Sequence, residues 1–231
     1  MANAANAINA TLYEKLNFNF IRDIAAVAGI SRAPLVFAVH PSVPARTVPE
    51  FIAYAKANPG KVNLASAGHG SAGHLAGELL KMLSGVELIH VPYRGNAPAL
   101  ADVIAGQVQV IFPSAASSVE FVKTGKIHAL ATTGAVRSDA MPDLPTVGDF
   151  IPGFETSSWY GLAVPKGTPD EIVQTLNREI NAGLADAKMS AALANIGGIP
   201  IPGSPADFAK LIADETEKWG KVIRAGNIKV N

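Results

Sequence analysis

The sequence predicts an α/β fold in which helices cover a parallel sheet. From residue 62 to residue 132, short apolar segments typical of strands alternate with segments that carry apolar residues at helical spacing. Repeated β–α–β units of this length form parallel sheets with right-handed crossovers. Two further strand-like segments, at 35–40 and 159–164, bracket the alternating region. If these two strands lie side by side, the chain forms two lobes with a hinge and a cleft between them.

The bracketing strands set the expected lobe boundaries. Residues 1–40 and 155–231 are expected to form lobe 1, and residues 41–154 to form an inserted lobe 2 that holds the alternating region. Within lobe 2, the predicted strands are 62–65, 88–92, 108–112 and 127–132, and the predicted helices are 72–83, 96–105 and 117–124.

The flanking regions also contain recognisable elements. Near the N-terminus, helical spacing predicts a helix over 4–16, and β-forming residues predict strands over 23–29 and 34–40. Thr47 is the expected N-cap of a helix over 49–57, because Pro49 suits a first helical turn. Towards the C-terminus the predicted elements are a short helix at 147–150, a strand at 157–165, and helices at 168–185 (capped by Thr168), 188–196 and 206–224.

Composition excludes several classes of protein. Of the 231 residues, 48% are hydrophobic and 16% are charged, which is typical of a globular chain and not of a disordered one. Basic and acidic residues are equal at 19 each, so no charge excess points to nucleic acid or to a membrane surface. Cysteine is absent, which excludes disulfides and thiolate chemistry. The N-terminal residues show no secretion signal, and no apolar run is long enough to span a membrane.

Three loops of the alternating region are the candidate site, at 66–71, 93–96 and 113–117. Each loop follows a strand and leads into a helix, and ligands bind beyond the carboxyl ends of strands in such sheets. The first loop is rich in Gly and Ser, so its backbone N–H groups and the helix start suit a small carboxylate. Ser71 either caps the helix or donates its hydroxyl to the ligand. The alternative is that the loop only connects a strand to a helix.

The expected ligand-binding residues are Ser66, Gly68, His69, Gly70, Ser71, Ala72, Tyr93, Arg94, Gly95, Ser114, Ser117 and Trp159. The N–H groups of 68–72 and the Ser71 hydroxyl are expected to hold one carboxylate, and the other two loops to complete the pocket. Arg94 has two open interpretations, a contact with the ligand's distal carboxylate or an ion pair with Asp102. Trp159 either forms a wall of the cleft or belongs to the core.

A serine hydrolase is the enzymatic alternative. Ser71 lies in a segment that nearly matches the nucleophile elbow G-x-S-x-G, and Asp102 and His128 follow in hydrolase order. However, His69 replaces the first glycine, and the preceding strand ends several residues before the serine. A metal site is the other alternative, since His74 and Glu78 lie four residues apart on one helix. No third ligand stands at a recognised spacing, so no metal and no cofactor is predicted.

Eight short motifs occur in a fixed order along nearly the whole chain. They are Asn-Ala-Ile-Asn-Ala-Thr-Leu-Tyr at 6–13, Asn-Pro-Gly-Lys at 58–61, Ser-Ala-Gly-His-Gly-Ser at 66–71, His-Val-Pro-Tyr-Arg-Gly at 90–95, Gly-Gln-Val at 106–108, Leu-Pro-Thr at 144–146, Trp-Tyr-Gly at 159–161 and Glu-Lys-Trp at 217–219. In this order they resemble the substrate-binding receptors of tripartite tricarboxylate transporters, the Bug or TctC family. The resemblance implies a two-lobed fold like that of type II periplasmic binding proteins, and a non-catalytic periplasmic receptor. Such a receptor captures a small carboxylate or dicarboxylate and delivers it to a membrane permease.

The sequence departs from the family pattern at two places. Many members have an acidic residue after the strand that ends here at Phe112, where it holds an amino group of the ligand. This chain has Pro113 there, so a plain carboxylate is expected. Members also begin with a secretion signal and further elements of the first lobe, so lobe 1 is expected to be incomplete. The chain is then expected either to be poorly stable or to cover its exposed apolar faces by self-association. A truncated cytosolic ligand sensor of the same fold remains an alternative.

Overall fold

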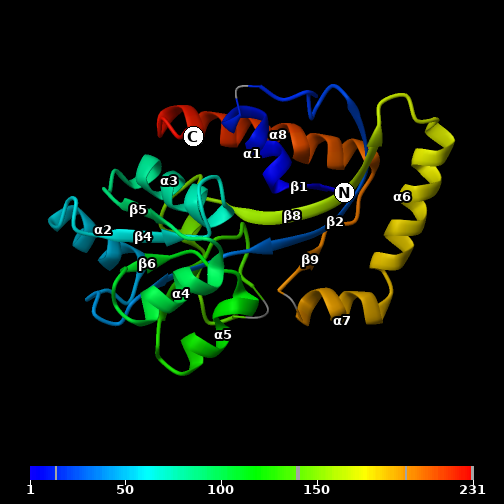
Figure 1. Cartoon of the computed structure of the whole chain (residues 1–231). Coiled ribbons are helices and arrows are strands. Elements are labelled where there is room, and N and C mark those ends of the chain that lie inside the picture. The colour runs from blue at the N-terminus through cyan, green and yellow to red at the C-terminus, as the bar shows by residue number, and fades with distance from the viewer. Residues whose placement is uncertain (14, 139–140, 196, 230–231) are drawn as a thin grey trace. The chain divides into compact units, whose positions relative to one another are not determined.

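The structure is a computed structural model, and it describes residues 1–13, 15–138, 141–195 and 197–229 (Figure 1). The chain forms two compact units. The first unit contains residues 1–33 and 158–231, and the second contains residues 34–157. The expected lobe boundaries lie after residues 40 and 154, whereas the boundaries between these two units lie after residues 33 and 157.

The second unit is built on a five-stranded sheet with the strand order β5-β4-β6-β3-β7. The strands are β3 (Val36–Val39), β4 (Asn63–Ser66), β5 (Ile89–Pro92), β6 (Val110–Ile111) and β7 (His128–Thr132). β4 pairs in parallel with β5 and with β6, as the alternation predicts. β3 lies between β6 and β7 and runs antiparallel to both, so the sheet is mixed and not wholly parallel. The pairing of 35–40 with 159–164, which the sequence suggests only as a condition, is therefore not formed.

Helices cover both faces of this sheet, and all four residues of β3 are buried as a result. Phe37 contacts Phe51 of α2 (Val48–Ala57) edge-on, with ring centroids 4.9 Å apart. The alternate residues Val36 and Ala38 join a cluster that includes residues of α4 (Asn96–Ile104) and α5 (Ala115–Lys123). α3 (Ala72–Ser84) packs on β4.

The first unit contains a four-stranded sheet with the order β1-β8-β2-β9. Its strands are β1 (Ala2–Asn3), β2 (Ile24–Pro34), β8 (Ser157–Pro165) and β9 (Ile199–Pro200), and its helices are α1 (Ala4–Leu12), α6 (Asp170–Leu184), α7 (Ala187–Asn195) and α8 (Pro205–Ala225). α1 packs along α8 (Figure 1). α8 begins with a capping box in which Ser204 and Asp207 bond each other's backbone N–H groups. Within the described ranges, no helix combines the length and apolarity needed to cross a membrane.

Most predicted elements are confirmed, with two clear differences at helix ends. α1 stops at Leu12, four residues before the expected end. α6 begins after Pro169, and the expected Thr168 cap is wrong. The Thr168 hydroxyl instead donates to the carbonyl oxygen of Pro165, 2.8 Å away, which closes the preceding turn. The short helix is confirmed as the 3₁₀ helix η1 (Val147–Asp149), capped by Thr146.

Candidate functional site

Three helices of the second unit begin at the same edge of its sheet. β5, β4 and β6 are neighbouring parallel strands, and the helices α4, α3 and α5 follow them directly in the chain. Because neighbouring parallel strands end at the same edge, the three connecting loops gather there, which confirms the expected convergence. The first turn of each helix carries backbone N–H groups without an acceptor inside the helix. This edge therefore concentrates partial positive charge from backbone N–H groups.

Part of the loop before α3 is already bonded within itself. The Gly68 N–H donates to the buried hydroxyl of Ser66 at 3.1 Å, and the Ser71 N–H donates to the Gly68 carbonyl at 3.2 Å. The Gly70 N–H donates to Nδ1 of His74 at 3.1 Å. Three of the five N–H groups expected to hold a carboxylate are thus used by the chain, and Ser66 is 2% exposed. These three N–H groups stabilise the shape of the loop and are not available to a ligand in this structure.

The start of α3 keeps donors that the chain does not use. The N–H groups of His69, Ala72 and Gly73 donate to no acceptor among the residues that the structure describes. Ser71 accepts the His74 N–H at 3.3 Å as the N-cap, and its own hydroxyl hydrogen remains available to donate. A Cβ at Gly73 would lie 3.0 Å from the Phe112 carbonyl oxygen, so glycine lets this turn approach the end of β6.

The start of α5 has a similar form. Ser114 is its N-cap and accepts the Ser117 N–H at 3.3 Å. The two hydroxyls are 2.8 Å apart, and the Ser117 hydroxyl also lies 3.0 Å from the Ser114 carbonyl oxygen. Both serines are half-buried. Because α5 begins at the end of β6, they lie at the sheet edge, as the sequence predicts.

The start of α4 has no side-chain cap. Gly95 is the N-cap residue with φ of +119°, a conformation that favours glycine. The hydroxyl of Tyr93 donates to Oδ2 of Asp102 at 2.7 Å, and desolvation followed by this bond raises the pKa of Tyr93 to about 12. Arg94 is exposed and forms no ion pair with any described residue. Of its two interpretations, the Asp102 pair is not formed.

Trp159 lies in the core of the first unit. Its side chain is 0% exposed, and its indole N–H donates to Oε2 of Glu215 at 3.2 Å. The ring also contacts Phe208 edge-on at 5.7 Å. Trp159 therefore offers no surface to a ligand here, and the core alternative describes its position.

The residues of the hydrolase alternative do not form a catalytic arrangement. Ser71 bonds the His74 backbone, and Asp102 bonds Tyr93. His128 Nε2 lies 2.9 Å from an Arg46 guanidinium nitrogen. No two of Ser71, Asp102 and His128 are hydrogen-bonded to each other, so the nucleophile lacks a base.

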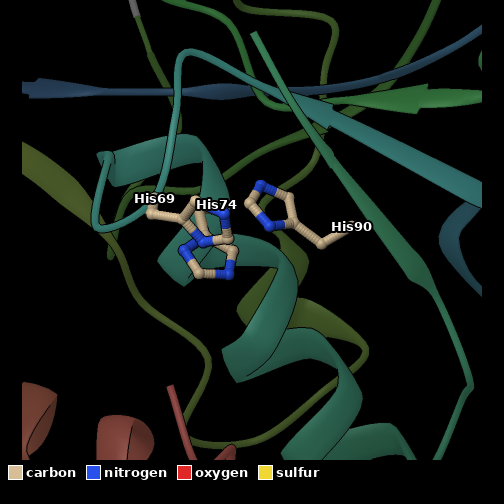
Figure 2. Close-up of side chains that lie close together, drawn as sticks. All are labelled: His69, His74 and His90. Atoms are coloured by element: carbon tan, nitrogen blue, oxygen red, sulfur yellow. The ribbon is translucent and has the colours of Figure 1, made fainter. Parts of the chain in front are cut away.

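Three histidines meet beside the first loop (Figure 2). His69 is exposed in the loop, His74 is 3% exposed on α3, and His90 is half-buried on β5. The rings of His74 and His90 stack with centroids 3.7 Å apart, and that of His69 lies edge-on to His90 at 5.0 Å. Burial, and then the neighbouring positive groups, lower the pKa of His74 to about 3 and of His90 to about 4, so both imidazoles are neutral at pH 7.

Sequence reasoning missed this cluster because it considered His74 only with Glu78 on the same helix. The pairing of β4 with β5 places His90 opposite Leu64, and this brings His90 to the loop that follows β4. The signal available in the sequence was a histidine on each of two consecutive β–α units.

Comparison with known proteins agrees with this architecture. The model of the tripartite tricarboxylate transporter family receptor matches residues 1–228. The UPF0065 protein in the tcbD-tcbE intergenic region of Pseudomonas sp. (strain P51) is 36% identical over 221 residues. That alignment covers 95% of this chain and 66% of the relative, so the chain spans slightly less than two thirds of that protein.

Two solved structures, each described with a carboxylate, are also similar. An R. palustris protein with adipate is 34% identical with a TM-score of 0.84, and the match covers 99% of this chain and 77% of that one. MatC from Rhodopseudomonas palustris with bound malate is 27% identical with a TM-score of 0.78, covering 96% and 77% of the two chains. The family match over almost the entire sequence and these structural likenesses lead to one conclusion. The chain belongs to the receptor family of tripartite tricarboxylate transporters, whose members are solute-binding proteins and not enzymes.

Proposed function

We propose that this chain captures a small carboxylate or dicarboxylate at the start of α3 and delivers it to a tripartite tricarboxylate transporter permease. The observation that carries the proposal is the set of unused donors there: the N–H groups of Ala72 and Gly73 and the Ser71 hydroxyl. The similar structures described with adipate and with malate support the ligand class. The family is periplasmic, and we assign this chain to the same compartment.

The geometry of this edge suits an anion with two acid groups. One carboxylate binds at the start of α3, where charge-assisted hydrogen bonds and the helix dipole act together. The second reaches a neighbouring helix start, with Ser114 and Ser117 at α5 or the exposed Arg94 before α4. Pro113 stands where an acid would hold an ammonium group, so we expect a plain dicarboxylate to bind more tightly than its amino derivative.

Replacing Ala72 with proline tests the proposal by removing one N–H. Ala72 is the first residue of α3, a position that proline tolerates, and Ser71 has φ of −68° and ψ of 156°, which a following proline permits. A charge-assisted hydrogen bond contributes about 1.5–3 kcal/mol, so affinity for adipate or malate should fall roughly 10- to 100-fold. Isothermal titration calorimetry measures this change.

The matched control is Ala72→Gly, which keeps the N–H group and should bind within about threefold of the wild type. Circular dichroism checks that both variants fold. Equal affinities of the proline variant and the wild type would show that the start of α3 is not the carboxylate site. Failure of the wild type to bind any of a panel of dicarboxylates would contradict the ligand class itself.

A further inference from the structure

We propose that His69, His74 and His90 form a binding site for a divalent transition-metal ion such as Zn²⁺. The three side chains come from the loop after β4, from α3 and from β5, and each offers a ring nitrogen within 4.8 Å of the other two (Figure 2). Neutral imidazole nitrogen is a preferred ligand of Zn²⁺, Ni²⁺ and Cu²⁺. Three histidines leave the fourth position of a tetrahedral ion open, and His69 is on the exposed side of the cluster.

The surroundings of His74 resemble the outer shell of a metal site. Its Nδ1 accepts the Gly70 N–H at 3.1 Å, so the neutral ring carries its proton on Nε2. Nε2 lies 3.8 Å from a carboxylate oxygen of the buried Glu78. An ion at Nδ1 would take the place of the Gly70 N–H and leave the Nε2 proton facing Glu78. A histidine held between a metal and a carboxylate in this way is a common arrangement, and the carboxylate raises the basicity of the ring.

His90 also has a polar partner that orients its ring. Its Nε2 lies 2.6 Å from the hydroxyl of Ser66, which is buried at the end of β4. The charge of Lys81 opposes a cation at this place, but Lys81 is bonded to both oxygens of Glu78 at 2.9 Å, which offsets that charge. The cluster therefore contains three ligand side chains, polar partners for His74 and His90, and a carboxylate, that of Glu78, which offsets the charge of Lys81.

Metal binding requires a local rearrangement, and the structure indicates where it occurs. Nitrogens bound to one tetrahedral Zn²⁺ lie about 3.4 Å apart, whereas the ring nitrogens of the three histidines are held only within 4.8 Å of one another. The stacked rings of His74 and His90 differ by 13°, so their in-plane lone pairs do not meet, and one ring must turn about its broad χ2 torsion. The loop must also release the Gly70 N–H. Gly68 and Gly70, with φ of +127° and +72°, flank the exposed His69 and give the loop this freedom.

Titration of the untagged chain with zinc chloride tests the site, in a buffer free of carboxylates and chelators. We expect saturable binding of one ion per chain by calorimetry, and His69→Gln should weaken it at least about tenfold. His69 is exposed, so this variant should keep the fold. The matched control is His40→Gln, which changes a half-buried histidine of the same unit that bonds Ser42. That control should bind zinc like the wild type.

A second readout identifies the place of binding. Zinc at a concentration that just saturates the wild type should shift the backbone amide NMR signal of Gly70, and the same concentration should shift it much less in His69→Gln. Absence of saturable zinc binding, or equal affinity in His69→Gln and the wild type, would overturn the proposal. The site goes beyond the proposed capture of carboxylates, and the two proposals are tested separately. Zinc binding is measured without any carboxylate, and carboxylate binding is measured in the presence of a chelator that carries no carboxylate group.

Discussion

Tyr93 illustrates how a single side chain shapes a loop of the candidate site through its hydrogen bonds. It follows β5, its N–H donates to the Ser66 carbonyl at 2.9 Å, and its hydroxyl donates to Asp102. These bonds tie the loop before α4 both to β4 and to α4 itself. The sequence predicts Tyr93 as part of the pocket. In the structure its hydroxyl bonds Asp102, so Tyr93 positions the loop before α4.

The raised pKa of Tyr93 predicts a loss of stability at alkaline pH. The folded chain holds this proton to a pKa of about 12, whereas the unfolded chain releases it near 10. The contribution of the neutral hydroxyl is therefore complete below pH 10 and is lost as the pH rises from 10 to 12. Tyrosinate absorbance of the wild type minus that of Tyr93→Phe should show a group titrating near pH 12. A difference that titrates near pH 10 would contradict the hydrogen bond to Asp102, and Tyr160→Phe, which changes an exposed tyrosine, is the matched control.

Several residue roles follow from sequence alone, and others do not. Ser71 and Thr47 are N-caps as the local pattern predicts, because capping depends on neighbours within three residues. Thr168 is not, since its hydroxyl finds a carbonyl in the preceding turn. The occupied N–H groups of Gly68 and Gly70 were also beyond prediction, because their acceptors depend on side-chain positions that no spacing specifies.

At the scale of elements, the packing of α3 on β4 places the candidate site. A Cβ on Gly77 would lie 2.0 Å from a methyl carbon of Leu64, which is itself 0% exposed. Glycine at this position therefore lets the helix lie close to the central strand of the three that end at the site. The distance of the helix start from the sheet edge depends on this contact.

Gly77→Ala should lower the free energy of unfolding by about 1–2 kcal/mol, because overpacking outweighs the gain in helix propensity. Gly183→Ala is the matched control, since a Cβ there meets nothing within 4 Å, and it should raise stability by about 0.5–1 kcal/mol. Urea unfolding measures both changes. If Gly77→Ala raised stability as Gly183→Ala is expected to do, the close approach of α3 and β4 would be disproved.

Element order was predictable because each β–α unit carries its own periodicity, but sheet topology was not. β3 comes early in the chain and inserts antiparallel between β6 and β7, with Val36 opposite Thr132 and Val39 opposite Val110. Such pairings join residues about 70 to 100 positions apart, and hydrophobic patterns within a strand do not specify its neighbour.

At the scale of the whole molecule, the ordered motifs identify the family, and the match over residues 1–228 confirms it. The two units each contain a sheet and their own buried core, which fits the expected α/β class with two lobes. The sequence leaves the position of Trp159 open, because an aromatic residue in a strand can line a cleft or belong to the core. Two indoles, those of Trp159 and Trp219, donate to the buried Glu215, and this network decides in favour of the core.

The proposed function depends on unused N–H groups at the start of α3 binding an acid group of the ligand. Backbone amide NMR during titration with adipate or malate tests this most directly, with a chelator free of carboxylate groups present to exclude metal. The amide signals of Ala72 and Gly73 should shift as ligand is added until binding saturates. The ligand concentration at half of the full shift should agree with the dissociation constant from calorimetry. Saturation of binding with both signals unchanged would contradict the account.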